Sequence, residues 1–168
     1  MRIIGGKLKG KKIFFVKSKI TRPLRDAVKE NIFNIINHSN KLDVEFENSR
    51  VLDFYSGIGS FGLECISRGA KKVMFIERDP TAKNILKKNL DSLSISEKAS
   101  IESDITNLHE FVKKDKFNIF FFDPPYKDNL FIEKIKMIKE NNLFDEKNIL
   151  IIHRENRTND NFENYFKI

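Results

Sequence analysis

The stretch RVLDFYSGIGSFG, residues 50–62, decides the fold. An apolar run at 51–54 leads into a turn with the pattern G-x-G-x-x-G, and a helical pattern follows at 61–68. Glycines in such a turn let the backbone approach a ligand and aim helix N–H groups at it. The pattern alone suits several nucleotide-like cofactors, or a tight turn that needs positive φ at Gly57 or Gly59. It predicts a strand-turn-helix unit within an α/β sheet.

From residue 50 onward, short apolar runs alternate with helical patterns. The expected strands are 51–54, 72–76, 99–102, 118–122 and 148–152. The expected helices are 61–68, 81–93, 106–113 and 129–140. Because strands separated by helices pair in parallel, this order predicts a doubly wound, mostly parallel α/β sheet of the Rossmann-like type.

Residues 1–48 form a basic N-terminal extension to this core. Apolar runs at 2–6 and 12–16 predict two short strands in a β-hairpin. Pro23 opens a helix, because proline is well suited to a first helical turn. The apolar positions of this helix recur every three or four residues and are expected to face the core: Leu24, Val28, Ile32 and Ile35.

The composition narrows the class of protein. The chain has 168 residues, 40% of them hydrophobic, which suits one domain spanning residues 1–168, with 49–168 as its cofactor-binding core. No apolar run approaches the roughly 20 residues that cross a bilayer, and the basic start lacks a signal peptide's apolar core. We therefore expect a cytoplasmic protein without membrane contact, and a monomer. Cys65 is the single cysteine and no Cys/His cluster has zinc-ligand spacing, so neither a disulfide nor a metal is expected.

The positive charge is concentrated at one end of the chain. The net charge is +7, and residues 1–30 hold ten Lys or Arg against two acids, which gives +8 there and −1 for the remainder. A basic end attracts polyanions through phosphate contacts, so nucleic acid is the leading partner, although a solvated lysine-rich surface has the same composition. The candidate RNA-phosphate contacts are Lys7, Lys9, Lys11, Lys12, Arg22 and Arg25.

Three acids close expected strands and, with Gly57 and Gly59, form a candidate cofactor site. Glu77 ends the second strand, where a carboxylate can accept hydrogen bonds from the ribose hydroxyls of an adenosine. Asp53 would repel a pyrophosphate but could pair with the amino group of S-adenosylmethionine; otherwise it is a capping or turn carboxylate. Asp104 is interpreted either as an acceptor for the adenine amino group or as a helix N-cap.

The most specific motif is NIFFFDPPY at residues 118–126. Its two prolines fix φ and remove two N–H donors, so the loop is stiff and presents carbonyl oxygens. The exocyclic amine of guanine or adenine is a poor nucleophile because its lone pair is delocalised into the ring. If Asp123 and the Pro124 carbonyl each accept an N–H, the nitrogen can pyramidalise towards a sulfonium methyl group. Asp123, Pro124, Pro125 and Tyr126 are therefore the candidate catalytic residues, with Tyr126 as a stacking face for the base; the plainer interpretation is a proline-stiffened turn.

Five segments carry a resemblance that covers nearly the whole chain. They are RIIGGKLKG at 2–10, TRP at 21–23, the loop at 53–64, SRGA at 67–70 and DPPY at 123–126. In these segments the chain resembles the RsmD-like family of bacterial 16S rRNA guanine-N2 methyltransferases. The opening and the Arg-Pro helix are the discriminating parts, because many amino-group methyltransferases share the other motifs.

The resemblance implies an activity, a substrate and a site. The activity is methyl transfer from S-adenosylmethionine to the N2 amine of one guanine in small-subunit rRNA, either naked or in the assembled subunit. Asp53, Gly57, Gly59, Glu77 and Asp104 would line the cofactor site, and residues 123–126 the target site.

Three departures from the family pattern accompany the resemblance. Leu24 and Arg25 stand where small polar residues are expected after Arg-Pro. His153 stands near the place where the family carries an acid after the fifth strand, and it is interpreted as a surface histidine. The family's fold continues through a terminal hairpin after a sixth strand. This chain ends at Ile168, soon after the place where the resemblance puts that sixth strand, so the terminal strand of the sheet is expected to be missing.

Three other functions remain open from the sequence. An adenine-N6 methyltransferase acting on DNA or RNA would use the same loop chemistry. An NAD-dependent oxidoreductase would use the same glycine pattern, although Asp53 and the lack of a Tyr-x-x-x-Lys pair argue against it. A non-catalytic RNA-binding protein would keep the basic end without methyl transfer.

Overall fold

The computed structural model describes residues 1–15, 24–39, 41–105, 116–125, 128 and 130–154. The elements follow one another as α1 (Asp26–His38), β1 (Arg50–Phe54), α2 (Ser60–Ser67), β2 (Lys72–Ile76), α3 (Pro80–Ser92), η1 (Ser96–Lys98), β3 (Ala99–Glu102), β4 (Phe117–Phe122), α5 (Phe131–Glu140) and β5 (Phe144–Ile152). All five expected strands are present, and β5 begins earlier than its sequence pattern predicted. The helix expected at 106–113 and the expected loss of a terminal strand concern residues outside the described part of the chain.

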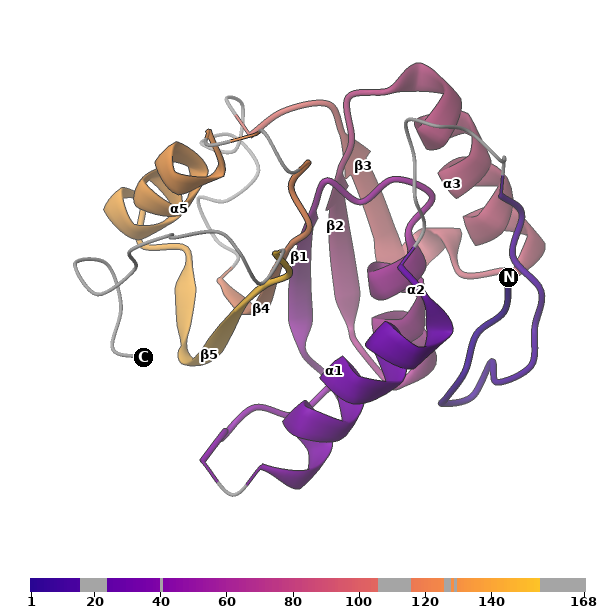
Figure 1. Ribbon diagram of the computed structural model, residues 1–168, viewed down its shortest axis with the longest axis horizontal. Helices are drawn as coiled ribbons and strands as arrows, with labels where there is room; N and C mark the ends of the chain where they lie inside the picture. The colour runs from indigo at the N-terminus through magenta and orange to yellow at the C-terminus, as the bar shows by residue number, and fades with distance from the viewer. Residues whose placement is uncertain (16–23, 40, 106–115, 126–127, 129, 155–168) are drawn as a thin grey trace.

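The five strands form one sheet in the order β3-β2-β1-β4-β5, and every neighbouring pair is parallel. This confirms the doubly wound, Rossmann-like α/β fold (Figure 1). The chain builds outward from β1 to β3 and then returns to add β4 and β5 on the other side of β1. Ligands of such sheets bind beyond the carboxyl ends of the strands where the strand order reverses. The carboxyl ends of β1 and β4 therefore mark the place to look for a site.

Helices cover both faces of the sheet, which explains why its strands are nearly continuous apolar runs. On the face covered by α1, α2 and α3, Phe61 stacks on Phe121 with ring centroids 4.0 Å apart. On the face covered by α5, Phe54 stacks on Phe122 at 4.2 Å. These two buried clusters hold the strand ends of β1 and β4 in fixed register, so the residues that follow these strands have rigid supports.

Helix α1 turns a wider face to the core than its sequence predicted, and one expected position lies outside that face. Lys29, Phe33 and Ile36 are its buried residues, whereas Ile35 is 62% exposed, so the expected stripe is wrong at that position. Leu24 is buried and Val28 and Ile32 are partly buried against the core as expected, so the buried face includes these positions as well as Lys29, Phe33 and Ile36. A charged residue concealed this face in the sequence. The Lys29 ammonium group can be buried because it donates a hydrogen bond to the Arg2 carbonyl at 3.0 Å.

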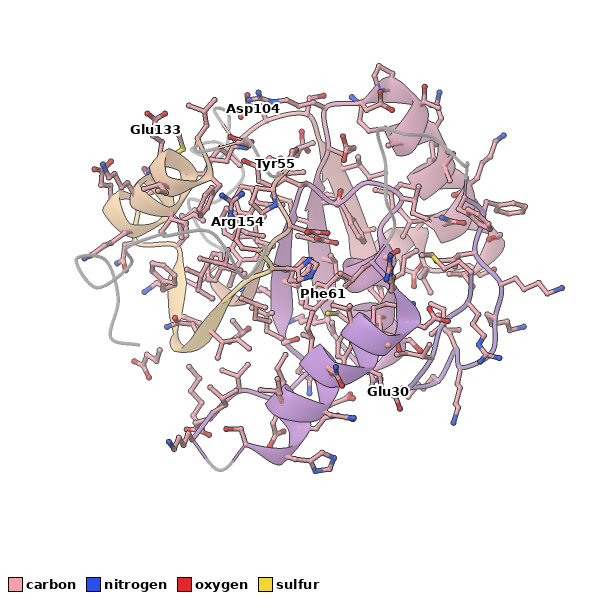
Figure 2. The ribbon with its side chains drawn as sticks, viewed as in Figure 1. Glu30, Tyr55, Phe61, Asp104, Glu133 and Arg154 are labelled. Atoms are coloured by element: carbon pink, nitrogen blue, oxygen red, sulfur yellow. The ribbon has the colours of Figure 1, made fainter. Side chains whose placement is uncertain are left out.

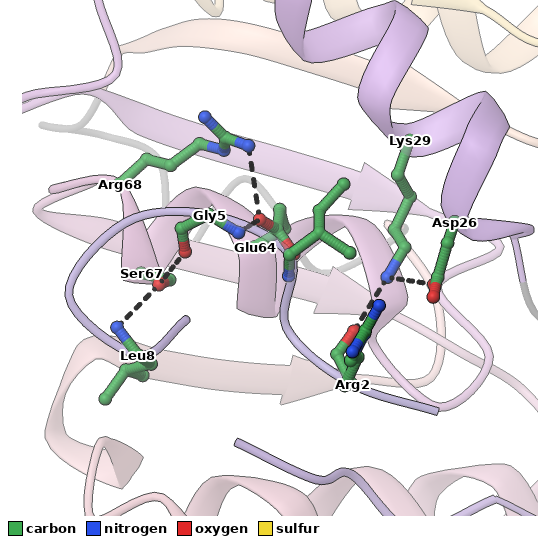
Figure 3. A network of polar contacts seen from close by, with 9 residues as sticks. Arg2, Gly5, Leu8, Asp26, Lys29, Glu64, Ser67 and Arg68 are labelled. Atoms are coloured by element: carbon green, nitrogen blue, oxygen red, sulfur yellow. Dashed lines mark hydrogen bonds and ion pairs between the residues drawn. The ribbon is translucent and has the colours of Figure 1, made fainter. Parts of the chain in front are cut away.

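The N-terminal arm, residues 1–15, forms less regular structure than the expected hairpin. The two predicted strands are wrong, because a single antiparallel bridge joins Arg2 to Lys12. Side chains of α2 bond to much of the arm backbone instead (Figure 3). The Glu64 carboxylate accepts the Gly5 N–H at 2.6 Å, and the Ser67 hydroxyl donates to the Gly5 carbonyl at 2.5 Å. The arm is therefore fixed to α2 in addition to the backbone hydrogen bonds that join residues 1–3 to residues 10–13.

Candidate functional site

Asp53 is the penultimate residue of β1, just before the glycine loop. It is 1% exposed, and its Oδ2 accepts the Gly62 N–H at 3.0 Å, which ties the strand to the first turn of α2. Its Oδ1 is buried and has no hydrogen-bond partner within the described residues. Burial raises the pKa of Asp53 well above its ordinary value of 3.8; the Gly62 hydrogen bond opposes the rise, and the charges of Asp123 and Glu77 reinforce it. A buried carboxylate oxygen without a partner is costly, and a cationic ligand group would satisfy it.

The three glycines of the loop have different roles. Gly57 and Gly59 have φ of 55° and 87°, in the left-handed region where side chains are strained. A Cβ on Gly59 would lie 2.4 Å from Leu86 Cδ1, and one on Gly62 would lie 2.3 Å from Phe75 Cε1, so both glycines serve close packing. A Cβ on Gly57 would meet no atom within 4 Å. Gly57 is thus the glycine that faces open space, as a glycine beside a bound ligand should.

Glu77 follows β2 and contacts the glycine loop directly. Its Oε2 accepts the Gly57 N–H at 2.7 Å, and its Oε1 accepts the Asp79 N–H at 2.8 Å. The structure therefore brings Glu77 and Gly57 together, as their positions after adjacent parallel strands predicted. Each carboxylate oxygen can accept two hydrogen bonds, so Glu77 retains acceptor capacity for ribose hydroxyls.

Asp104 lies beyond β3 at the same edge of the sheet (Figure 2). Its Oδ2 forms an ion pair with the Arg78 guanidinium group, and its Oδ1 accepts the N–H of Ile105 at 2.6 Å. The sequence interpretation did not foresee the contact with Arg78. The helix that Asp104 would cap lies outside the described residues, so that interpretation stays a prediction.

The loop that follows β4 lies at the strand-order reversal, because β1 and β4 pair directly. Asp123 is partly buried, and its Oδ1 lies 2.8 Å from Nδ1 of His153. The side chain of His153 is 41% exposed, as expected of a histidine near the surface, but the sequence interpretation missed its contact with Asp123. The Pro125 carbonyl accepts the Asp128 N–H at 2.8 Å.

A tyrosine and a lysine that the sequence analysis did not single out meet at this edge. Tyr55 has a φ of 56°, and its hydroxyl accepts a hydrogen bond from Lys134 Nζ of α5 at 2.6 Å. Burial lowers the pKa of Lys134, and burial together with the Asp128 carboxylate raises the pKa of Tyr55. The feature that marks Tyr55 is its positive φ beside the glycine loop, which is uncommon for a residue other than glycine. A backbone angle is a property of the structure, so the sequence carried no signal for this residue.

A buried asparagine connects the N-terminal arm to the glycine loop. Asn89 of α3 has no exposed surface; its Nδ2 donates to the carbonyls of Phe14 and Ile58 at 3.1 Å, and its Oδ1 accepts the Phe14 N–H at 2.6 Å. The sequence analysis missed this residue, because an Asn in a helix usually lies at the surface. Through Asn89, the arm and the turn after β1 share one anchor.

The candidate basic residues are divided between the described and undescribed parts of the chain. Five of the candidate cations are exposed, on the N-terminal arm or just before α1: Lys7, Lys9, Lys11, Lys12 and Arg25. Arg22 and the candidate stacking residue Tyr126 lie outside the described residues. Five of the six candidate cations are thus accessible to a polyanion. The predictions for Arg22, the sixth cation, and for Tyr126 stay untested.

Other features of the described part of the chain lie away from this edge. A hollow of about 470 Å³ is lined by Asp43, Glu45, Glu47 and Arg68 among others, beside the start of β1 rather than its carboxyl end. Within the described ranges, no three His, Cys, Asp or Glu side chains converge as metal ligands would, and no helix is long and apolar enough to cross a membrane.

Comparison with known sequences identifies relatives along almost the whole chain. The profile of the family described as Conserved hypothetical protein 95 matches residues 1–167. Ribosomal RNA small subunit methyltransferase D of Haemophilus influenzae is 37% identical over 158 residues, covering 92% of this chain and 79% of the relative. The Escherichia coli protein of the same name is 31% identical over 157 residues, covering 92% and 75%. These findings confirm the resemblance read from the sequence motifs.

Solved structures agree with the fold and with the enzyme class. A provisionally named methyltransferase of Escherichia coli, yhhF, superposes with a TM-score of 0.72 at 29% identity, covering 89% of this chain and 78% of that one. A provisionally named methylase of Haemophilus influenzae gives a TM-score of 0.67 at 34% identity, covering 94% and 82%. The chain belongs to the Conserved hypothetical protein 95 family and is a methyltransferase with the Rossmann-like fold that its sequence predicted.

Proposed function

We propose that this chain transfers the methyl group of S-adenosylmethionine to the exocyclic N2 amine of a guanine in small-subunit ribosomal RNA. The observation that carries the proposal is the meeting of two loops at the strand-order reversal. The loop after β1 holds Asp53 and Gly57, and the loop after β4 holds Asp123 and Pro124. The proposed cofactor site thus lies beside the hydrogen-bond acceptors of Asp123 and Pro124, at the place where related sheets bind ligands. The relatives named as rRNA small subunit methyltransferases support the choice of substrate.

The residues on the cofactor side fit S-adenosylmethionine. Asp53 has a buried Oδ1 without a partner in the described residues, which a positively charged amino group would satisfy. Gly57 faces open space, and Glu77 beside it has acceptor capacity for two ribose hydroxyls. Asp104, held by Arg78, lies one strand further along and is the proposed partner of the adenine amino group. A pyrophosphate would place negative charge against Asp53, which argues against a dinucleotide at this site.

On the target side, the proposed mechanism requires acceptors and positioning. When bound, S-adenosylmethionine supplies an electrophilic methyl group. The Asp123 carboxylate and the Pro124 carbonyl would each accept an N–H of the target amine, so that its lone pair leaves conjugation with the ring. The prolines hold both acceptors in place before the substrate arrives, and such positioning supplies much of the rate acceleration. Tyr126 is the proposed stacking surface for the base.

The RNA side of the proposal rests on the exposed cations of the N-terminal arm. Lys7, Lys9, Lys11 and Lys12 are exposed, and the arm is fixed to the core through Glu64. A rigid basic surface can contact phosphates without a large ordering cost. We propose that the chain acts as a monomer in the cytoplasm, where the ribosomal subunit is available.

The test is transfer of labelled methyl from S-adenosylmethionine to small ribosomal subunits that lack the modification. The unchanged chain is compared with Asp123→Ala and with Asp91→Ala, a matched control at an exposed aspartate of α3. We expect N2-methylguanosine from the unchanged chain and the control, and a loss of about 100-fold or more in Asp123→Ala. Mass analysis of the nucleosides identifies the product.

Two other results would replace the proposal. Methylated adenine would establish the adenine-N6 alternative, since the same acceptors serve that amine. Cofactor binding without transfer to either RNA or DNA would instead identify a non-catalytic RNA-binding protein.

A further inference from the structure

We propose that His153 is a positioning residue of the methyl-transfer site, and that its Nδ1–H holds one oxygen of Asp123 so that the other oxygen faces the target amine. This inference rests on the function proposed above, because it assigns a role relative to Asp123 as an acceptor. It adds the residue that follows β5 to a site otherwise built from the ends of β1, β2, β3 and β4.

The backbone fixes where His153 lies. In the sheet register Ile152 of β5 is opposite Phe122 of β4, so the next residues on both strands are Asp123 and His153. The His153 N–H donates to the Phe122 carbonyl at 2.8 Å, which extends the pairing by one residue. The side chains of His153 and Asp123 then meet at 2.8 Å. A parallel ladder therefore delivers the imidazole to the carboxylate without the help of a flexible loop.

A contact of this length requires a proton between the two atoms. The Asp123 carboxylate presents lone pairs only, and an unprotonated Nδ1 would present another, so the two atoms would repel each other at 2.8 Å. The more basic imidazole carries the proton, and Nδ1–H donates to Oδ1. Nε2 is then the nitrogen of His153 that gains or loses a proton as the pH changes.

This hydrogen bond restrains a side chain that would otherwise turn freely. The terminal torsion of an aspartate is broad, so a partly exposed carboxylate samples many orientations. With Oδ1 held by His153, Oδ2 is the oxygen left to accept an N–H of the target amine. Reactive groups held close to their productive geometry are a general requirement for catalysis by positioning.

The charges around the pair give the arrangement a dependence on pH. Asp123 follows β4, and the charge of Asp123 acts on Asp53, which lies near the end of the neighbouring strand β1. Arg154 follows His153 in the chain and donates to the Pro125 carbonyl at 3.2 Å. The hydrogen bond to Asp123 raises the pKa of His153 above its ordinary value of 6.5, against the effect of burial. An imidazolium here draws electron density from the carboxylate and opposes the positive charge that develops on the attacked amine. Methyl transfer should therefore rise as the pH rises through the raised pKa of His153.

The first test follows the imidazole directly, by nuclear magnetic resonance titration of the full chain without substrate. The chain has three histidines, and His153→Asn identifies the resonance that belongs to His153 by removing it. We expect its pKa to lie above 6.5 in the unchanged chain and to fall in Asp123→Asn. A pKa that does not move in Asp123→Asn overturns the inference, whatever the enzyme methylates.

The second test measures kcat and KM against pH with S-adenosylmethionine and small ribosomal subunits. His153→Asn keeps a donor near the position of Nδ1 but cannot titrate, so we expect its kcat to stay within about threefold of the plateau and to lose the acid limb. His153→Phe removes the donor and the titrating group, and we expect a pH-independent kcat about 10-fold below the wild-type plateau, while KM and cofactor affinity stay within about twofold. His38→Asn, at the exposed end of α1, is the matched control.

Three outcomes separate this inference from the function on which it rests. A wild-type kcat in His153→Phe with its melting temperature preserved, or an acid limb that persists in His153→Asn, overturns the positioning role while methylation stands. A raised His153 pKa in a chain that methylates no RNA shows that the proposed function has failed, and the positioning role fails with it. Loss of the acid limb in His153→Asn together with the kcat loss in His153→Phe establishes the inference.

Discussion

Replacing Asp53 by asparagine should make the protein more stable and a poorer binder of S-adenosylmethionine. Asp53 is 1% exposed, and its Oδ1 has no partner within the described residues. Burial raises its folded-state pKa above the ordinary value of 3.8. The folded state therefore holds a proton more tightly than the unfolded chain, so the free energy of unfolding falls as the pH rises from the unfolded pKa to the folded one. Above that window the full cost of the buried charge is present, and Asp53→Asn removes it.

Three contributions give the size of the effect. Replacing a buried charge by a neutral amide recovers about 2–3 kcal/mol of desolvation. The bond from the Gly62 N–H changes from a charged to a neutral acceptor, which costs about 1 kcal/mol. The net gain is about 1–2 kcal/mol, which in a chain of this length corresponds to about 3–6 °C in melting temperature.

The cofactor should remove most or all of the stability advantage of Asp53→Asn over the unchanged chain. At a concentration of about 100 times Kd, S-adenosylmethionine adds about 2.7 kcal/mol to the stability of the unchanged chain. Removing the charge of Asp53 costs at least about 2 kcal/mol of binding, which raises Kd about 30-fold and leaves a stabilisation below about 1 kcal/mol at the same concentration. Thermal melts with and without the cofactor at pH 7–8 measure both quantities.

Asp91→Asn on the exposed surface of α3 is the control and should change the melting temperature by less than about 1 °C. Asp53→Asn melting below the unchanged chain without cofactor would refute the burial argument. An unchanged cofactor-induced shift in Asp53→Asn would refute the assignment of Asp53 to the amino group of the cofactor.

Other predictions concern the packing around the same loop. Gly62→Ala should destabilise the protein by about 2–3 kcal/mol in denaturant unfolding, because its Cβ would lie 2.3 Å from Phe75 Cε1; full stability would mean that α2 can shift away from the sheet. Gly57→Ala should cost only about 1 kcal/mol of backbone strain but lower cofactor affinity in calorimetry, and unchanged affinity would remove Gly57 from the site. Asn89→Ala should cost about 2–3 kcal/mol and increase hydrogen exchange at Phe14, whereas unchanged exchange there would show that Asn89 does not anchor the arm.

The sequence was sufficient for the sheet and for the edge at which the site lies. Strand and helix patterns are local, and a parallel connection has one handedness, so the element order predicted a doubly wound parallel sheet, whereas the pairing of β4 with β1 comes from the structure. All parallel strands end at the same edge, so Asp53, Glu77 and Asp123 had to lie near one another once their strands were identified. The packing roles of Gly59 and Gly62 came from the structure, since the sequence analysis had placed Gly59 in the cofactor site.

Features that the sequence did not reveal, or gave wrongly, depend on contacts between distant parts of the chain. The face that α1 buries is set by a lysine that reaches the Arg2 carbonyl 27 residues away, and hydropathy counts that lysine as a surface residue. The arm is held by Glu64, 59 residues from Gly5, in addition to its own backbone pairing.

The contact between His153 and Asp123 is of the same kind. Thirty residues separate them in the chain, and nothing local to either one specifies a partner. Local pattern determines which elements form and in what order, because it reflects the period of burial along each element. Which polar groups meet was decided only by the tertiary structure, because a buried hydrogen bond requires two side chains to reach one point at about 3 Å after the sheet has set their positions.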